Sequence, residues 1–124
     1  MKFKRTFTPQ EANIRLPLIK QIVADILAKG KDFRARLSKH TGPEMPVECL
    51  NLQAEIEGLM IELEDLGCYY KDWNFEIELV DFPAVIDGQQ VLLCWRSDEE
   101  RLKWYHSLQD GYPGRRPIPE YLLN

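Results

Sequence analysis

The residues most able to do chemistry gather in one short stretch, "LLCWRSDEERLKWYH", at 92–106. It holds Cys94, one of three cysteines, and His106, one of two histidines. A cysteine near a histidine can act as a nucleophile beside its base. The competing interpretation is that Cys94, which stands in an apolar run, packs as a small hydrophobic side chain. We expect the packing role, because a reactive thiol needs a partly exposed, electropositive setting.

The spacing of Glu99 and His106 bears on metal binding. Ser97 and Glu100 match a capping box, which predicts a short helix over about 98–109. On such a helix Glu99 and His106 share a face but lie roughly 10 Å apart along the axis. Because that distance is too long for one metal ion, the sequence predicts no metal site and no cofactor. We expect His106 to pair with a nearby carboxylate, and a catalytic role is the alternative.

The stretch "DGYPGRRPI" at 110–118 contributes a third group, Arg115. A guanidinium can bind a carboxylate or a phosphate through two parallel hydrogen bonds. The partner is either a small anionic ligand or an acidic residue of the same chain. The acidic residues considered are Asp81, Glu99 and Asp110. We expect the intrachain ion pair, with Arg116 facing the solvent.

These groups meet where a strand is expected to pass into the short helix. If the protein has a pocket there, the side chains expected to line it are Cys94, Trp95, Glu99, His106 and Arg115. The sequence contains no G-x-S-x-G motif, no phosphate-binding loop and no dinucleotide fingerprint. We therefore expect a non-enzymatic binding or protein-interaction module. The alternative is an enzyme or a small-anion-binding protein that uses this junction.

Two amphipathic helices are predicted before the junction. The first begins after Thr8, which forms a capping box with Glu11. In both helices the apolar positions recur in steps of four and three, as in a heptad seam. These positions are Ala12, Leu16, Ile19, Val23, Ile26, Gly30, Phe33 and Leu37, then Leu52, Ile56, Leu59, Leu63 and Leu66. Pro17 lies inside the first pattern, and we expect a kinked but continuous helix. A Gly- and Pro-rich loop joins the two helices into an antiparallel hairpin.

The hydrophobic period then changes from helical to near two. "FEIELVDF" at 75–82 alternates like a half-buried strand. Asp87 and Gly88 predict a type I′ hairpin turn. A two-residue turn at that point places Asp81 opposite Cys94 on the next strand. The end of the chain is rich in Gly and Pro and is expected to be extended.

The predicted fold class is therefore α+β in a single domain over 1–124. A long antiparallel helical hairpin covers about 8–67. A small antiparallel β-sheet, a short helix and an extended C-terminal tail follow at about 68–124. The two helical seams can bury each other, but other apolar positions of the hairpin still need cover. We therefore expect a homodimer formed through the helical hairpin.

Composition narrows the class of partner. The chain has 124 residues, a net charge of -4 and a pI near 5.2. Because duplex binding draws its affinity from Lys and Arg, we expect no nucleic-acid partner. The apolar runs are too short for a membrane span, so we expect no membrane partner. No signal peptide is recognised, and the odd number of cysteines has no C-x-x-C spacing, which predicts a cytoplasmic protein.

Several segments together resemble a known family. They are "FTPQEANIRLPLI", "KD" at 71–72, "LVDFPAVIDGQQVLLCW", the Glu99 to His106 spacing and "DGYPGRRPI". In this order they resemble domain of unknown function family 2203, a family of conserved bacterial proteins. The resemblance covers nearly the whole chain, least at 38–50. It implies a small bacterial α+β protein and implies no activity.

Overall fold

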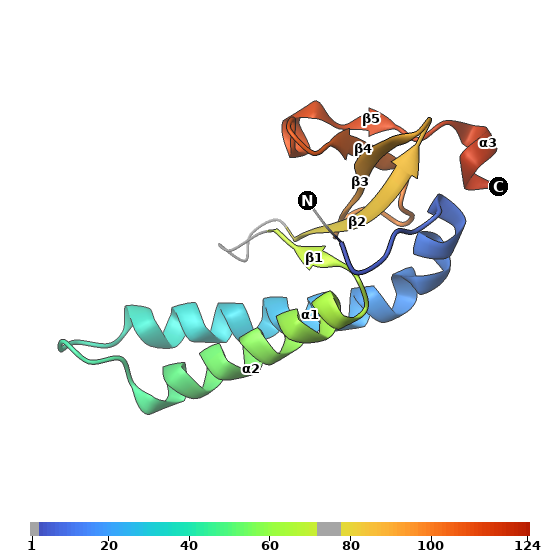
Figure 1. Cartoon of the computed structure of the whole chain (residues 1–124). Helices are drawn as coiled ribbons and strands as arrows, with labels where there is room; N and C mark the ends of the chain where they lie inside the picture. Colours follow the sequence, from blue (N-terminus) through green and yellow to red (C-terminus); the bar gives the residue numbers. More distant parts are fainter. Residues whose placement is uncertain (1–2, 72–77) are drawn as a thin grey trace.

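The computed structural model describes residues 3–71 and 78–124. Two long helices come first, and a five-stranded antiparallel sheet with a short C-terminal helix follows. The predicted α+β class is confirmed. Figure 1 shows the two helices as an arm whose connecting loop lies at the end remote from the sheet. None of the helices in these two ranges is long and apolar enough to cross a membrane.

Helix α1 (Pro9–Ser38) begins as the sequence predicts. The Glu11 N–H donates to Thr8 Oγ1 at 3.1 Å, and the Thr8 N–H donates to Glu11 Oε1 at 3.0 Å. This reciprocal pair satisfies two of the backbone donors that every helix start leaves free. Pro17 lies inside α1 and the helix stays continuous, as expected. Its first turns are inclined to the rest of the helix in Figure 1.

Helix α2 (Val47–Asp65) runs back along α1, so the predicted hairpin is confirmed. It ends where Gly67 takes a φ of +93°, a conformation that favours glycine after a helix. The two helices stay in contact from the sheet to near the loop, where Cys49 Sγ lies 4.0 Å from the Phe33 carbonyl oxygen. The buried members of the two seams are Ala12, Leu16, Ile19, Val23, Ile26 and Gly30 in α1, with Ile56 and Leu63 in α2. Leu37, at the far end of α1, is exposed.

The sheet is a meander in which every strand pairs antiparallel with the next. Its strands are β1 (Tyr69–Tyr70), β2 (Leu79–Ile86), β3 (Gln89–Arg96), β4 (Trp104–Ser107) and β5 (Arg116–Pro117). Asp87 and Gly88 both have positive φ, 52° and 77°, as the predicted type I′ turn requires. The register places Asp81 opposite Cys94, also as predicted. The beginning of the expected strand, 75–77, lies outside the described residues.

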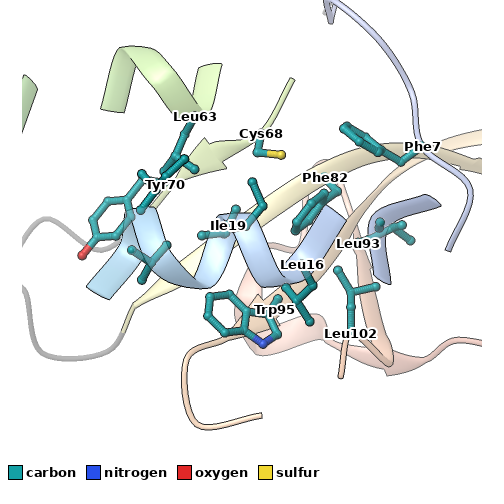
Figure 2. Close-up of a cluster of buried hydrophobic side chains, with 14 of the residues drawn as sticks. Phe7, Leu16, Ile19, Leu63, Cys68, Tyr70, Phe82, Leu93, Trp95 and Leu102 are labelled. Carbon is teal, nitrogen blue, oxygen red and sulfur yellow. The ribbon is translucent and has the colours of Figure 1, made fainter. Parts of the chain in front are cut away.

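The core lies between one face of the sheet and the two helices, and this face is called the inner face below. Alternate residues of β2 and β3 point into it, because neighbouring side chains of a strand lie on opposite faces. Figure 2 shows side chains of α1 and α2 meeting those of the sheet in this layer. The labelled members are Phe7, Leu16, Ile19, Leu63, Cys68, Tyr70, Phe82, Leu93, Trp95 and Leu102, all buried.

The predicted helix at 98–109 is wrong. A turn at Ser97 and Asp98 leads into irregular chain, and residues 104–107 form β4 against β3. The helical interpretation rested on a local capping pattern, whereas the open edge of β3 supplies backbone partners that the local sequence does not reveal. The extended tail is wrong in part. It contains the 3₁₀ turn η1 (Tyr112–Gly114), β5 and the short helix α3 (Glu120–Leu123).

Candidate functional site

Three neighbouring strands bring Asp81, Cys94 and His106 together. Asp81 on β2 faces Cys94 on β3, and His106 on β4 faces Leu92, two residues before Cys94. Because side chains alternate along a strand, all three point away from the core, to what is called the outer face below. One donor atom from each lies within 4.8 Å of the other two. The sheet thus builds a group of side chains that the helices do not touch.

This group, the Asp81–Cys94–His106 cluster, is deeply buried. The exposed fractions are 3% for Asp81, 1% for Cys94 and 3% for His106. Residues of the chain after β4 lie beside the cluster, among them Leu108 and Tyr112. A pocket of about 300 Å³ adjoins the cluster. Its other lining residues are Lys71, Leu79, Leu92, Leu108, Gly111 and Tyr112.

His106 has an oxygen atom beside each ring nitrogen. Nδ1 lies 2.8 Å from the carbonyl oxygen of Ser107, and Nε2 lies 3.4 Å from Asp81 Oδ1. Both oxygens can accept a hydrogen bond, so each ring nitrogen can donate to its neighbour. Burial lowers the pKa of His106, but the hydrogen bonds with Asp81, Cys94 and the neighbouring carbonyl outweigh it. This pKa is raised from 6.5 to about 10. At neutral pH the raised pKa therefore keeps His106 protonated on both ring nitrogens.

Arg115 and Glu99 form a second polar pair beside the cluster. Arg115 Nη2 donates to both Glu99 oxygens, at 2.6 and 2.8 Å, and to the Cys94 carbonyl at 3.1 Å. The guanidinium carbon also lies about 5 Å from the ring centres of Trp104 and Tyr112, at 5.1 and 5.0 Å. The side chains are only 11% and 15% exposed. The intrachain ion pair expected for Arg115 is present, and Glu99 is its partner.

Trp95 lies on the other side of the sheet from Cys94. Its ring is buried in the inner-face core, and its Nε1–H donates to the Glu99 carbonyl at 2.8 Å. Of the five predicted pocket residues, Cys94 and His106 line the pocket, Glu99 and Arg115 stand beside it, and Trp95 does not reach it. Arg116 is exposed, as expected, with its guanidinium over the Tyr105 ring.

Asp81 is the site residue that the sequence analysis missed. The predicted turn at Asp87 and Gly88 already placed Asp81 opposite Cys94, so one signal was available. The second signal, the pairing of β4 with β3, was hidden because 98–109 was assigned to a helix. On a helix, His106 would have had Glu99 as its neighbour on the same face. In the sheet its neighbour is Asp81, two strands away.

The geometry limits what this cluster can do. In a nucleophilic triad the imidazole uses one nitrogen for the nucleophile and the other for the orienting carboxylate. Here Nδ1 is held by the Ser107 carbonyl, and Asp81 approaches the remaining nitrogen. Asp81 and Cys94 therefore share one ring nitrogen, whereas in a triad the nucleophile and the carboxylate each have their own. The arrangement suits holding a bound group better than activating a thiol.

Comparison with known proteins identifies a family without an assigned activity. The model of a family described as uncharacterized conserved protein, DUF2203, matches residues 5–118. Nothing matched the chain among curated proteins or among solved structures.

Proposed function

The chain belongs to the DUF2203 family of uncharacterized conserved proteins, and from the site itself we propose that it is a binding protein and not an enzyme. Its ligand is held at the Asp81–Cys94–His106 cluster and occupies the adjoining pocket. The observation that carries this proposal is the convergence of three buried polar side chains from three strands on one pocket. All three lie on the face of the sheet that the helices leave free.

Energetics support a role beyond stability. Burying charged and polar side chains costs desolvation energy, and a well-packed apolar replacement is often as stable or more so. Apolar residues at these three positions would be enough to pack the end of the chain against the outer face. Binding a ligand would explain why these three positions are polar, whereas packing alone would not.

The small-anion alternative loses its main residue. Arg115 is committed to Glu99 and to the Cys94 carbonyl, so its charge is already neutralised within the chain. Among the described pocket-lining residues, Lys71 and the imidazolium of His106 are the remaining cations, and Asp81 balances the latter. Lys71, which is exposed, therefore leaves the described lining with one net positive charge, but the pocket lacks the two-pronged guanidinium on which the anion alternative relied.

Thiol labelling tests whether the cluster is open to a ligand. We expect a small reagent such as iodoacetamide to modify Cys94 in the native protein before Cys49 or Cys68, because only Cys94 lines the pocket among these three buried thiols. Peptide mapping by mass spectrometry follows each thiol separately. Leu108→Trp is the matched variant, since it fills the pocket and should slow Cys94 alone.

Equal labelling rates for the three cysteines would mean that reagent reaches Cys94 only when the whole protein unfolds. The binding proposal would then fail. Rapid labelling of Cys94 at a pH well below the ordinary pKa of a thiol would point the other way. It would reveal a reactive thiolate and favour the enzyme alternative.

We also propose a homodimer through the helical hairpin. Its support is a row of exposed apolar side chains on α2, formed by Val47, Leu50 and Ile61. At 100° per residue these three fall within one narrow stripe of the helix. Sedimentation at micromolar concentration should give twice the 14.6 kDa chain mass. Leu50→Glu should return the monomer, and a wild-type protein that sediments as a monomer would rule the dimer out.

The setting proposed for this protein is the bacterial cytoplasm. The resemblance to a bacterial family supports the first part. The three free cysteines support the second, because thiols persist in a reducing compartment.

A further inference from the structure

We propose that Asp81, Cys94 and His106 bind one divalent transition-metal ion, with Zn²⁺ the best fit, and leave its fourth position open to the pocket. This inference rests on the proposed binding function and names the ligand that the cluster holds. The three residues are the group of potential metal-binding side chains found in the described parts of the chain. Thiolate, imidazole and carboxylate are the three side-chain donors that zinc uses.

The distances suit a tetrahedral ion. Zinc bonds to these donors are about 2.0–2.3 Å long, so the edges of the tetrahedron measure about 3.3–3.7 Å. The separation of 3.4 Å between His106 Nε2 and Asp81 Oδ1 falls within that range. It is long for a charged hydrogen bond, which prefers about 2.7–2.9 Å. All donor atoms lie within 4.8 Å of one another. To reach a tetrahedral edge of about 3.5 Å, no two of them would have to approach by more than about 1.3 Å.

The orientation of His106 is the one that metal-binding histidines adopt. Its Nδ1–H donates to the Ser107 carbonyl at 2.8 Å and thereby fixes the ring. The lone pair of Nε2 is then directed toward the other two donors. A backbone carbonyl or carboxylate on the far nitrogen is the usual outer partner of a metal-bound imidazole. In this arrangement the ion takes the place of the proton on Nε2.

The charge of the cluster also balances around a dication. When the ion binds, Cys94 gives up its thiol proton and His106 gives up the proton on Nε2, and both pass to solvent. A thiolate and a carboxylate then offset the two positive charges of the metal. Neutrality matters because the cluster is almost fully buried, where an uncompensated charge is costly.

The open position points to a role for the pocket. Closed structural zinc sites use four protein ligands, whereas sites with three keep a position open. In enzymes water or substrate takes that position, and in the proposed binding site it is left to a small ligand. The pocket beside the cluster can supply that fourth ligand.

Cobalt substitution tests the assignment directly. We expect protein stripped with a chelator to bind one Co²⁺ per chain and to develop thiolate-to-cobalt charge transfer in the near ultraviolet, with intense visible bands typical of four-coordination. Zn²⁺ should abolish both signals. Cys94→Ser should remove the charge transfer. Asp81→Asn and His106→Gln should each weaken cobalt binding by about 10–100-fold or more, because losing even an outer-shell partner of a metal site has an effect of that size.

Two variants serve as matched controls. His40→Ala removes the other histidine, which is exposed, and Cys49→Ala removes another buried free thiol. Neither should change the cobalt spectrum or the affinity. Loss of the charge transfer in Cys49→Ala, together with its survival in Cys94→Ser, would place the metal elsewhere and overturn the proposal.

Zinc protection gives a readout that needs no substitution. Zn²⁺ should slow the labelling of Cys94 in the wild-type protein and leave Cys49 and Cys68 unchanged. If Cys94 labels readily with and without Zn²⁺ and no cobalt spectrum forms, the metal assignment fails while the binding function stands. If all three thiols label together and no spectrum forms, both fail.

Discussion

The inner and outer faces of the same sheet differ in almost every respect. Residues that alternate along β2 and β3 supply both, so Phe82 and Trp95 face the helices while Asp81 and Cys94 face away. The inner face is apolar and continuous with the helical seam. The outer face carries two buried polar groups, the Asp81–Cys94–His106 cluster and the Glu99–Arg115 pair. The inner face thus supplies the apolar core, and the outer face carries the proposed binding site.

The covers of the two faces differ as well. Helix α1, with its 30 residues, covers the inner face and packs on α2 as well. Part of the chain after β4 lies beside the outer face, and Arg115 fastens it to Glu99. Surface segments of this kind open more readily than packed helices. We therefore expect the outer face to be able to admit a ligand without disturbing the core.

The largest contrast is expected for two adjacent leucines. Leu93 is completely buried on the inner face, while Leu92 lies on the outer face and lines the pocket. Leu93→Ala should lower the free energy of unfolding by about 3–5 kcal/mol, because it leaves a cavity in a packed core. Leu92→Ala should cost about 2 kcal/mol or less, since it enlarges a space that already reaches solvent. Urea melts of the two variants measure the difference, and equal losses would contradict the contrast.

The sequence predicted the inner face better than the outer one. Its signals are local: the capping box at Thr8, the helical seams, and the turn at Asp87 and Gly88 that set the register of β2 and β3. Each of these signals depends on residues close together in the chain, so the local sequence pattern is enough to predict the corresponding element. The alternation along β3 even separates Trp95 from Cys94, although both were expected to line one pocket.

The outer face depends on partners far apart in the chain. The stretch that forms β4 also matches a helix, and only the free edge of β3 decides between the two structures. The choice of Glu99 over other acids for Arg115 likewise depends on where the end of the chain folds back. Because these contacts join segments that local patterns do not relate, Asp81 was not recognised as a site residue.

The next contrast compares Arg115, which is ion-paired with Glu99, with its exposed neighbour Arg116. Arg115→Ala should destabilise the protein by about 2–4 kcal/mol, because it leaves Glu99 as a mostly buried and unpaired charge. Arg116→Ala is the control. Its side chain is exposed, so its loss should cost less than about 1 kcal/mol. Equal small losses in denaturant melts would mean that the ion pair does not clamp the tail.

The pH dependence of stability separates the cluster from the core. The pKa of His106 in the folded protein, about 10, lies above its ordinary value of 6.5. The folded state therefore binds the proton more tightly, and the resulting stabilisation is complete below about pH 6.5 and lost as pH rises to about 10. We expect a loss of a few kcal/mol over this window in metal-free protein, because each unit of pKa difference between the folded and unfolded states contributes about 1.4 kcal/mol.

Chelator-treated protein melted in urea across that window tests this expectation. His106→Gln cannot titrate and should be less stable at neutral pH, but it should lack the alkaline decline attributed to His106. Parallel pH profiles for the wild type and the variant would show that the imidazolium contributes nothing.

The smallest contrast applies one substitution to both faces. Cys68 lies among apolar side chains in Figure 2, and burial raises the pKa of its thiol to about 12. Cys68→Ser would place a hydroxyl there at a cost of about 1–3 kcal/mol. In metal-free protein Cys94→Ser should cost less than about 1 kcal/mol, because the new hydroxyl can donate to the carboxylate of Asp81. Because the two substitutions are chemically identical, the difference between their losses in unfolding free energy reports the difference in polarity between the two faces. A larger loss at Cys94 than at Cys68 would mean that the cluster tolerates no change of donor, and would contradict the expected difference in polarity between the two faces.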